Sequence, residues 1–267
     1  MRQPLSSTVS MAGLPHLSRR HFVAWVCGAL AFASSPLLAR TDDSRARDLL
    51  LRADRIRFPD EPFQVDVVIT TFAPEAEPEE RAYRILSRGN TRTLVQTTAP
   101  AVERGQILLM RDRELWAFLP NLSQPIRLPL AQRLTGQVAN GDLARANFAG
   151  DYVPSILREE IVSGEEHTVL RLDALDRWVT YRSVNYWVNA RTARPYKAEF
   201  HAVSGRLLKT ATYRDFEELG GRIRPTRMVV EDALRPGYRS ELAYSDMMPR
   251  DLPDRLFTKD YLKRLSR

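Results

Sequence analysis

Cysteine is nearly absent from this chain of 267 residues, and histidine is scarce. The single cysteine, Cys27, lies near the N-terminus, so the rest of the chain has no thiol for a disulfide, a metal ligand or a nucleophile. Long apolar runs are also lacking, because the run from Phe22 to Ala33 is much shorter than the roughly 20 residues that a membrane-spanning helix needs. We therefore expect a protein that is not integral to a membrane and that is stabilised by a hydrophobic core, for which the chain is long enough.

The N-terminal segment has the pattern of an export signal. Residues 18–22 (SRRHF) precede the apolar run as in a twin-arginine signal, which directs folded proteins to export, and the general secretory route is the alternative. Cleavage is expected after Ala39, with Ala33 as the alternative site. The sequence thus predicts a cleaved signal over residues 1–39 and a single exported domain over residues 40–267, in the periplasm.

The charge pattern argues against a nucleic-acid partner. The net charge is +7, and three of the positive charges (Arg2, Arg19 and Arg20) fall in the predicted signal, which leaves +4 for the domain. Acidic and basic residues alternate in that domain, for example over residues 111–114 (RDRE). Such mixing is the ordinary pattern of a hydrated surface, whereas a nucleic-acid site needs basic residues gathered on one face.

Hydrophobic periodicity predicts one N-terminal helix followed by a series of strands. Apolar residues recur at three- and four-residue spacing over residues 43–56, and Phe58-Pro59 ends that helix. From Val65 onward the period is that of strands joined by hairpin-length turns, which implies an antiparallel sheet. Residues 256–265 are expected to form a short amphipathic helix. The expected strands cover residues 65–71, 81–87, 91–96, 106–110, 115–119, 126–128, 156–162, 168–172, 186–189, 195–201, 207–215, 223–231 and 238–244.

Residues 130–152 interrupt the strand series. This segment is neither alternating nor strongly amphipathic, and Asp142 is placed to cap a helix over residues 143–148. We expect a helical loop that lies across a sheet face. Long insertions of this kind in compact β domains often carry function.

Motifs for catalysis, metal binding and phosphate binding are not found. The chain has no G-x-S-x-G, no H-E-x-x-H and no glycine-rich phosphate loop. After the predicted signal it has only His167 and His201, and residues 165–167 (EEH) are better explained as a polar turn than as a metal or acid–base site. We therefore expect no enzymatic activity, no metal and no cofactor.

Both faces of the strand at residues 115–119 are apolar. Trp116 and Phe118 share one face, while Leu115, Ala117 and Leu119 share the other. Trp116 and Phe118 either belong to the core or line a cavity in a curved sheet.

Arginines near this region have two possible roles. Arg127 lies between two apolar residues, and Arg145 follows in the insertion. Each is either an ordinary surface residue or a ligand for an anionic lipid head group, which the planar guanidinium suits.

Several segments spread over most of the predicted domain carry a resemblance to a known family. They are residues 105–110 (GQILLM), 115–120 (LWAFLP), 125–128 (PIRL), 132–152 (QRLTGQVANGDLARANFAGDY), 196–200 (YKAEF) and 256–262 (LFTKDYL). Together these segments resemble the outer membrane lipoprotein-sorting protein family, which is similar to the LolA/LolB carriers.

The resemblance implies a mainly β fold with some helix. The implied architecture is a strongly curved, incomplete antiparallel β-barrel of about eleven strands, with helices that cover its concave face and leave a hydrophobic cavity for acyl chains. We expect a periplasmic carrier that binds acyl chains of lipoproteins or lipids and shuttles them between membranes. The alternative is a non-catalytic accessory module that docks on an inner-membrane lipid exporter. The residues expected at the cavity wall are Val67, Ile69, Leu109, Trp116, Phe118, Phe148 and Trp187, with Arg127 or Arg145 at its mouth.

Overall fold

The computed structural model describes residues 36–89, 91–144 and 147–265. The chain divides into two units, Met1–Ser35 and Pro36–Arg267, and the second is described here. The predicted export signal lies outside the described residues except for its last four positions, so its cleavage stays a prediction. No helix within the described ranges has the length and apolar character needed to cross a bilayer.

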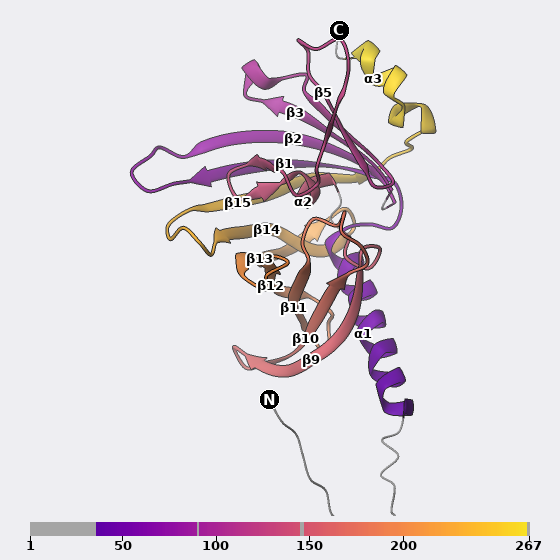
Figure 1. Ribbon diagram of the computed structural model, residues 1–267, viewed down its shortest axis with the longest axis vertical. Helices are drawn as coiled ribbons and strands as arrows, with labels where there is room; N and C mark the ends of the chain where they lie inside the picture. The colour runs from indigo at the N-terminus through magenta and orange to yellow at the C-terminus, as the bar shows by residue number, and fades with distance from the viewer. Residues whose placement is uncertain (1–35, 90, 145–146, 266–267) are drawn as a thin grey trace, which may run out of the picture. The chain divides into compact units, whose positions relative to one another are not determined.

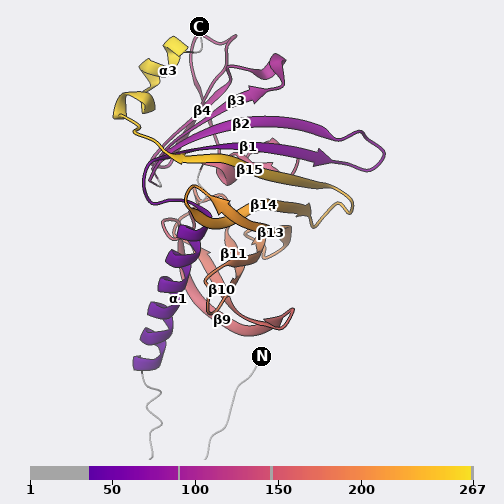
Figure 2. The same ribbon diagram turned by 180° about the vertical axis from the view of Figure 1, so that it is seen from behind.

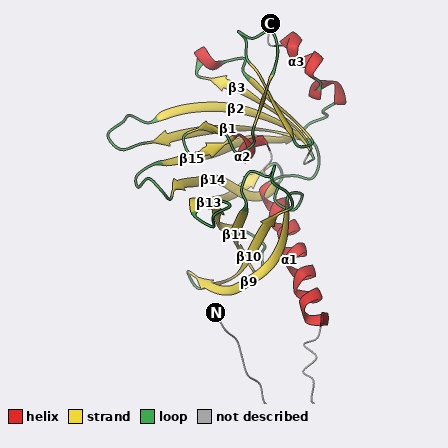
Figure 3. Cartoon of the chain, viewed as in Figure 1, coloured by secondary structure: helices red, strands yellow, loops and turns green. Residues whose placement is uncertain are grey.

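The described residues form a main sheet of thirteen antiparallel strands (Figures 1 and 3). Their order in the sheet is β6-β5-β4-β3-β2-β1-β15-β14-β13-β12-β11-β10-β9. Only the β1–β15 pair joins strands that are distant in sequence, so the sheet is two meanders joined edge to edge. The strands are β1 (Phe63–Phe72), β2 (Glu79–Arg88), β3 (Arg92–Ala99), β4 (Ile107–Arg111), β5 (Glu114–Phe118), β6 (Ile126–Leu128), β9 (Tyr152–Val162), β10 (Glu165–Ala174), β11 (Ser183–Asn189), β12 (Pro195–His201), β13 (Leu207–Leu219), β14 (Arg222–Asp232) and β15 (Arg239–Pro249).

The predicted antiparallel meander is confirmed, because each strand expected from the period overlaps one strand of this sheet. The sheet is also open, since its edge strands β6 and β9 do not pair with each other. The number of about eleven strands, taken from the resemblance, is wrong. The described residues contain fifteen strands, thirteen in the main sheet and two in a separate pair, β7 (Arg133–Thr135) and β8 (Val138–Ala139). Strands β7 and β8 are the two that the sequence did not predict, because both lie in the 130–152 segment that was expected to be a helical loop.

One face of the main sheet, here called the inner face, is covered by helices α1 (Pro36–Arg57) and α2 (Asn140–Ala144). The sheet bends around them, as Figures 1 and 2 show from opposite sides. The predicted apolar stripe of α1 is confirmed, because four of its members are buried in the inner core and the fifth, Ile56, packs against that core while partly buried. That core includes Ala46, Leu49, Leu50 and Ala53 of α1, and Val65, Val67, Ile69, Leu170, Leu172, Val184, Tyr186 and Leu242 of the sheet.

The opposite face, here called the outer face, is covered at strands β2–β5 by the C-terminal segment. This segment contains the 3-10 turn η2 (Asp254–Phe257) and helix α3 (Lys259–Leu265). It buries Leu252, Phe257 and Leu262 against the outer side of those strands. The two apolar faces predicted for β5 are therefore both covered by protein, one by each core.

The insertion at residues 130–152 crosses the inner face, as expected, but its helix is displaced. Helix α2 begins at Asn140, three residues before the expected start. Asp142 lies inside the first turn, where its Oδ2 accepts a hydrogen bond from the N–H of Ala139 at 2.7 Å. A carboxylate that reaches back from the first turn satisfies a backbone donor as the acidic member of a capping box does.

Candidate ligand-binding face and the segment that fills it

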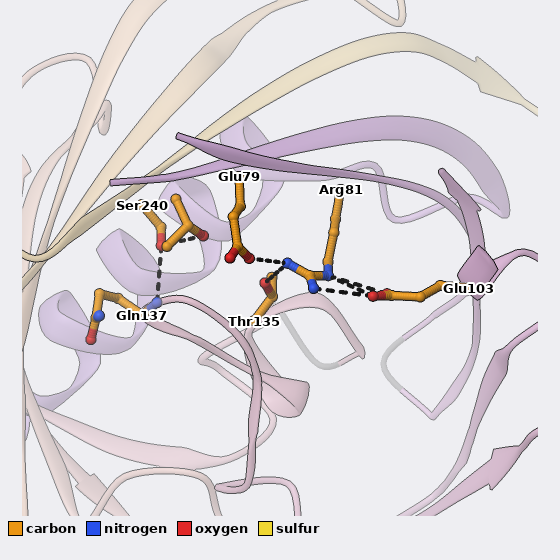
Figure 4. Close-up of polar contacts among 7 residues, drawn as sticks. Glu79, Arg81, Glu103, Thr135, Gln137 and Ser240 are labelled. Atoms are coloured by element: carbon orange, nitrogen blue, oxygen red, sulfur yellow. Dashed lines mark hydrogen bonds and ion pairs between the residues drawn. The ribbon is translucent and has the colours of Figure 1, made fainter. Parts of the chain in front are cut away.

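Residues 129–151, here called the plug segment, are held on the inner face by three groups of polar contacts. The first is at the tip of the β7–β8 hairpin (Figure 4). The N–H of Gln137 donates to Ser240 Oγ at 2.9 Å, and Ser240 Oγ lies 3.4 Å from Thr71 Oγ1. Gly136 has a φ of +48°, and its Cα lies so close to Ser240 and Thr71 that an added Cβ would collide with both hydroxyl oxygens. Only glycine fits this approach of the backbone to the sheet.

Arg81 of β2 anchors the neighbouring turn. Its guanidinium donates to Glu103 at 3.0–3.2 Å, to Glu79 at 2.9 Å and to Thr135 Oγ1 of the plug segment at 3.3 Å (Figure 4). The hydrogen bonds to Glu103 and Glu79 raise the pKa of Arg81 above its usual value. A fixed guanidinium therefore joins the sheet, the β3–β4 turn and the plug segment.

Replacing Gly136 with alanine is expected to lower the free energy of unfolding by roughly 2–3 kcal/mol, because the added methyl group combines a positive φ with overpacking. Gly164→Ala is the matched control. Gly164 also has a positive φ, of +81°, but an added Cβ there meets no atom within 4 Å, so its cost should stay near 1 kcal/mol. If urea denaturation gave the same loss in free energy of unfolding for Gly136→Ala and Gly164→Ala, the close packing of the hairpin tip would be contradicted.

The second group of contacts surrounds Asp142. Its carboxylate accepts hydrogen bonds from Lys209 Nζ of β13 at 2.5 Å and from the Tyr181 hydroxyl at 2.9 and 3.1 Å. Lys209 Nζ also donates to the carbonyl oxygen of Gln137 at 2.9 Å. Side chains of Lys209 and Asp142 are only 9% and 12% exposed. Burial, followed by the negative charge of Asp142, raises the pKa of Tyr181 well above its usual value, so this phenol stays protonated as a donor.

The third group joins α1 to the end of the plug segment. Asp54 Oδ2 accepts hydrogen bonds from the backbone N–H groups of Phe148 at 3.0 Å and Ala149 at 2.8 Å, and Oδ1 lies 3.4 Å from Arg57 Nη1. The guanidinium of Arg57 lies 4.5 Å from the centre of the Phe148 ring, a cation–π distance. Burial raises the pKa of Asp54 from 3.8 to about 6, and the nearby Arg57 opposes this rise only in part.

Small cavities remain beneath the plug segment. One of about 40 Å³ lies between Asp54, Ile85 and Leu143, and one of about 30 Å³ lies between Arg57, Phe148 and Tyr181. Pockets for drug-sized ligands measure about 300–1,000 Å³. An acyl chain therefore fits the inner face only if the plug segment or α1 moves.

A larger cavity of about 200 Å³ opens beside the hairpin. It lies between Val138 of the plug segment, Leu208 and Lys209 of β13, Tyr181 and Leu234. Lys209, the cation of the buried pair, thus lines a cavity at the edge of the plug segment.

Comparison with known proteins identifies the family. A family model described as an uncharacterized protein matches residues 89–264, and no curated protein matches. A LolA superfamily protein from Nitrosomonas europaea has 56% sequence identity, covers 81% of this chain and 98% of its own, and superposes with a TM-score of 0.78. The chain belongs to the LolA superfamily. This confirms the family inferred from the sequence.

Two further solved structures share the fold at low identity. A domain from Vibrio parahaemolyticus, described as an outer membrane lipoprotein-sorting protein, has 22% identity and a TM-score of 0.71, with 85% of this chain and 100% of that chain covered. A DUF1329 family protein from Desulfovibrio piger has 19% identity and a TM-score of 0.71, with 83% and 99% covered. Their similarity supports the LolA-like open sheet.

The structure divides the residues expected at the cavity wall between the two faces. Val67, Ile69 and Phe148 belong to the inner core of this LolA superfamily member. Leu109, Phe118 and the partly buried Trp116 belong instead to the outer cluster under the C-terminal segment. Side chains alternate across a strand, so these two groups cannot line one cavity. The sequence could not show which side chains of β4 and β5 face the inner core, because both faces of these strands are apolar.

Trp187 also lies on the outer face. It neighbours Tyr186 and Val188 of the inner core, and its ring lies between Arg158, at 5.3 Å, and Lys197, at 4.6 Å. Its indole N–H donates to Glu160 at 3.1 Å. Trp187 therefore packs among charged side chains on the outer face. The sheet separates it from Val67 on the inner face.

Of the two arginines expected at the mouth of the cavity, the structure describes only Arg127. Arg127 is exposed and lies 3.2 Å from Glu114 in an ion pair at the outer edge of the sheet. Arg145 lies outside the described residues, so its role stays a prediction.

Sequence reasoning missed the charged residues of the inner face, although a signal was present. Asp54 is four residues after Leu50 on the buried stripe of α1, and Arg57 follows three residues later. Lys209 similarly precedes Ala211 and Tyr213 on the buried side of β13. A charged residue at a position whose period demands an apolar one indicates a buried polar site.

Proposed function

We propose that this LolA superfamily protein is a periplasmic carrier, which binds acyl chains of lipoproteins or lipids on its inner face and shuttles them between membranes without chemistry. The observation that carries the proposal is the plug segment, which covers an apolar sheet face through polar anchors. The export-signal pattern supports the location, with the twin-arginine and general secretory routes both open.

The polar anchors favour exchange of the plug segment for a ligand. When the segment leaves, water can hydrate Ser240, Lys209 and Asp142, so these groups lose little in free energy. The apolar inner face cannot be satisfied by water in this way. An acyl chain would cover it and gain roughly 0.8 kcal/mol for each buried CH₂ group.

The direct test is mass spectrometry of the protein isolated from cells under non-denaturing conditions, together with uptake of a fluorescent fatty acid in solution. We expect a bound acylated species near one per protein, or saturable uptake of the probe. A protein that is empty and takes up no probe would overturn the carrier proposal.

A disulfide that fastens the plug segment is expected to abolish uptake of the probe. Cysteines in place of Gly141 and Thr180 are suitable, because a Cβ at position 141 lies 3.2 Å from the Cβ of Thr180, close to the ≈3.5 Å lower end of the disulfide range. Uptake by the oxidised variant should fall at least about tenfold, and reduction of the same sample should restore it. Undiminished uptake with the bridge intact would place the binding site elsewhere.

The alternative function is a non-catalytic module that docks on an inner-membrane lipid exporter. The small inner cavities favour it, because they show the inner face in a filled state. Uptake of the fatty-acid probe would favour the carrier, whereas an empty protein that copurifies with a membrane exporter would favour docking.

A further inference from the structure

Three turns form a continuous rim beside the 200 Å³ cavity. They are residues 175–182 between β10 and β11, 202–206 between β12 and β13, and 233–238 between β14 and β15. The N–H of Arg182 in the first turn donates to the carbonyl of His201, the last residue of β12 before the second turn, at 3.2 Å. The N–H of Ala233 in the third turn donates to the carbonyl of Leu208, in β13 just after the second turn, at 3.0 Å.

The rim exposes large apolar side chains that no other part of the described chain covers. Leu175 is 51% exposed, Trp178 59%, Val203 87% and Leu234 48%. Single exposed apolar residues are common, but here each of the three turns presents at least one. Clustered exposure of this kind marks a surface that meets a partner.

The same turns are positively charged. They contain four arginines, at positions 177, 182, 206 and 235, and a single carboxylate, Asp176. That carboxylate forms an ion pair with Arg113 of the β4–β5 turn. Asp232, at the end of β14, pairs with Arg235 at 2.9 Å, and the neighbouring β1–β2 turn carries acidic residues that limit the positive surface on that side.

Trp178 gives the rim a feature suited to one kind of partner. Its ring stacks with the guanidinium of Arg177 at 4.7 Å, while most of the ring remains exposed. Tryptophan prefers the boundary between water and hydrocarbon, where its apolar ring and its N–H are both satisfied. Arginines beside it bind lipid phosphates.

We infer that this rim docks on the surface of an anionic phospholipid bilayer, with Trp178, Leu175, Val203 and Leu234 entering the head-group region and the arginines binding phosphates. The inference rests on the proposed carrier function and adds the membrane-facing end of the molecule. Docking there brings the cavity between Leu234, Tyr181 and Val138 to the membrane, at the edge of the plug segment. A lipid could then pass to the inner face without crossing bulk water.

Vesicle sedimentation of the protein isolated from cells tests this inference. Vesicles of phosphatidylcholine alone are compared with vesicles of phosphatidylcholine mixed with phosphatidylglycerol. We expect binding to the anionic vesicles that weakens with salt, a blue shift of tryptophan fluorescence, and loss of that shift in Trp178→Ala. Since each arginine near an anionic membrane contributes about fivefold to affinity, Arg177→Glu with Arg206→Glu should weaken binding by at least about 25-fold.

The matched control is Arg191→Glu in the β11–β12 turn, which is exposed and lies at the other end of the same strands. It makes a charge change of the same sign away from the rim and should weaken binding by about twofold at most. Three results would each overturn docking through the rim. They are no binding to anionic vesicles, an unchanged blue shift in Trp178→Ala, and a loss of vesicle affinity in Arg191→Glu that equals the loss per charge in the rim variant.

Uptake of the fatty-acid probe from solution separates the two proposals. Rim variants that lose vesicle binding but keep probe uptake support both. Vesicle binding through the rim without probe uptake would overturn the carrier function and leave the rim supported. Probe uptake without vesicle binding would overturn the rim and leave the carrier function intact.

Discussion

Lys209→Met is expected to lower the free energy of unfolding by about 3–5 kcal/mol at neutral pH. The variant keeps the length of the side chain but removes the cation that neutralises the Asp142 carboxylate. Tyr181 and the N–H of Ala139 still donate to that carboxylate, but they do not supply a positive charge. A buried carboxylate without a counterion is costly, and urea denaturation measures the loss.

Two controls identify the cause. The double variant that combines Lys209→Met with Asp142→Asn has no uncompensated carboxylate. It should therefore recover at least half of the free energy of unfolding that Lys209→Met loses. Arg52→Met breaks the Arg52–Asp48 pair, whose side chains are 44% and 68% exposed, and should cost less than about 1 kcal/mol. A double variant no more stable than Lys209→Met alone would show that packing, and not charge, is responsible.

Asp54 is expected to make the protein less stable as the pH rises from about 4 to about 7. Burial raises the pKa of its carboxyl from 3.8 to about 6, so the folded protein holds this proton more tightly than the unfolded chain. Folding takes up a proton between those two values. The stability contributed by the protonated form is complete below 3.8 and is lost as the pH passes through 6. The separation of the two values corresponds to about 3 kcal/mol.

Comparison with Asp54→Asn isolates this contribution from the other titrating groups. The free energy of unfolding of the wild type, less that of the variant, should fall by about 3 kcal/mol across this pH range. Urea titrations at several pH values measure the difference. A difference that is constant with pH, or that grows as the pH rises, would mean that the ion pair with Arg57 outweighs burial.

Both residues connect the plug segment to the rest of the protein, so stability and ligand exchange are linked. Lys209 holds Asp142 of α2, and Asp54 holds the backbone of residues 148–149. A variant that weakens either anchor should raise the population of molecules in which the inner face is open. Carrier function and fold stability are therefore expected to oppose each other at these two sites.

The sequence by itself determined the strands of the main sheet, the buried side of α1 and the family. Period-2 alternation located every strand of the main sheet, and the stripe at residues 46, 49, 50 and 53 located the buried side of α1. These signals are local, because each depends on which side chains of one element face the core. The resemblance over residues 105–152 led to the LolA superfamily, which the Nitrosomonas europaea protein confirms.

Only the tertiary structure decided which residues share a face and what fills it. Leu109 and Trp116 are apolar like Val67, but they face the C-terminal segment, because both sides of β4 and β5 are covered. Asp54, Asp142 and Lys209 are far apart in sequence, and the plug segment unites them beneath one surface. Which residues share a covered face depends on which distant segment packs on that face. The alternation of side chains within a strand carries no information about that segment.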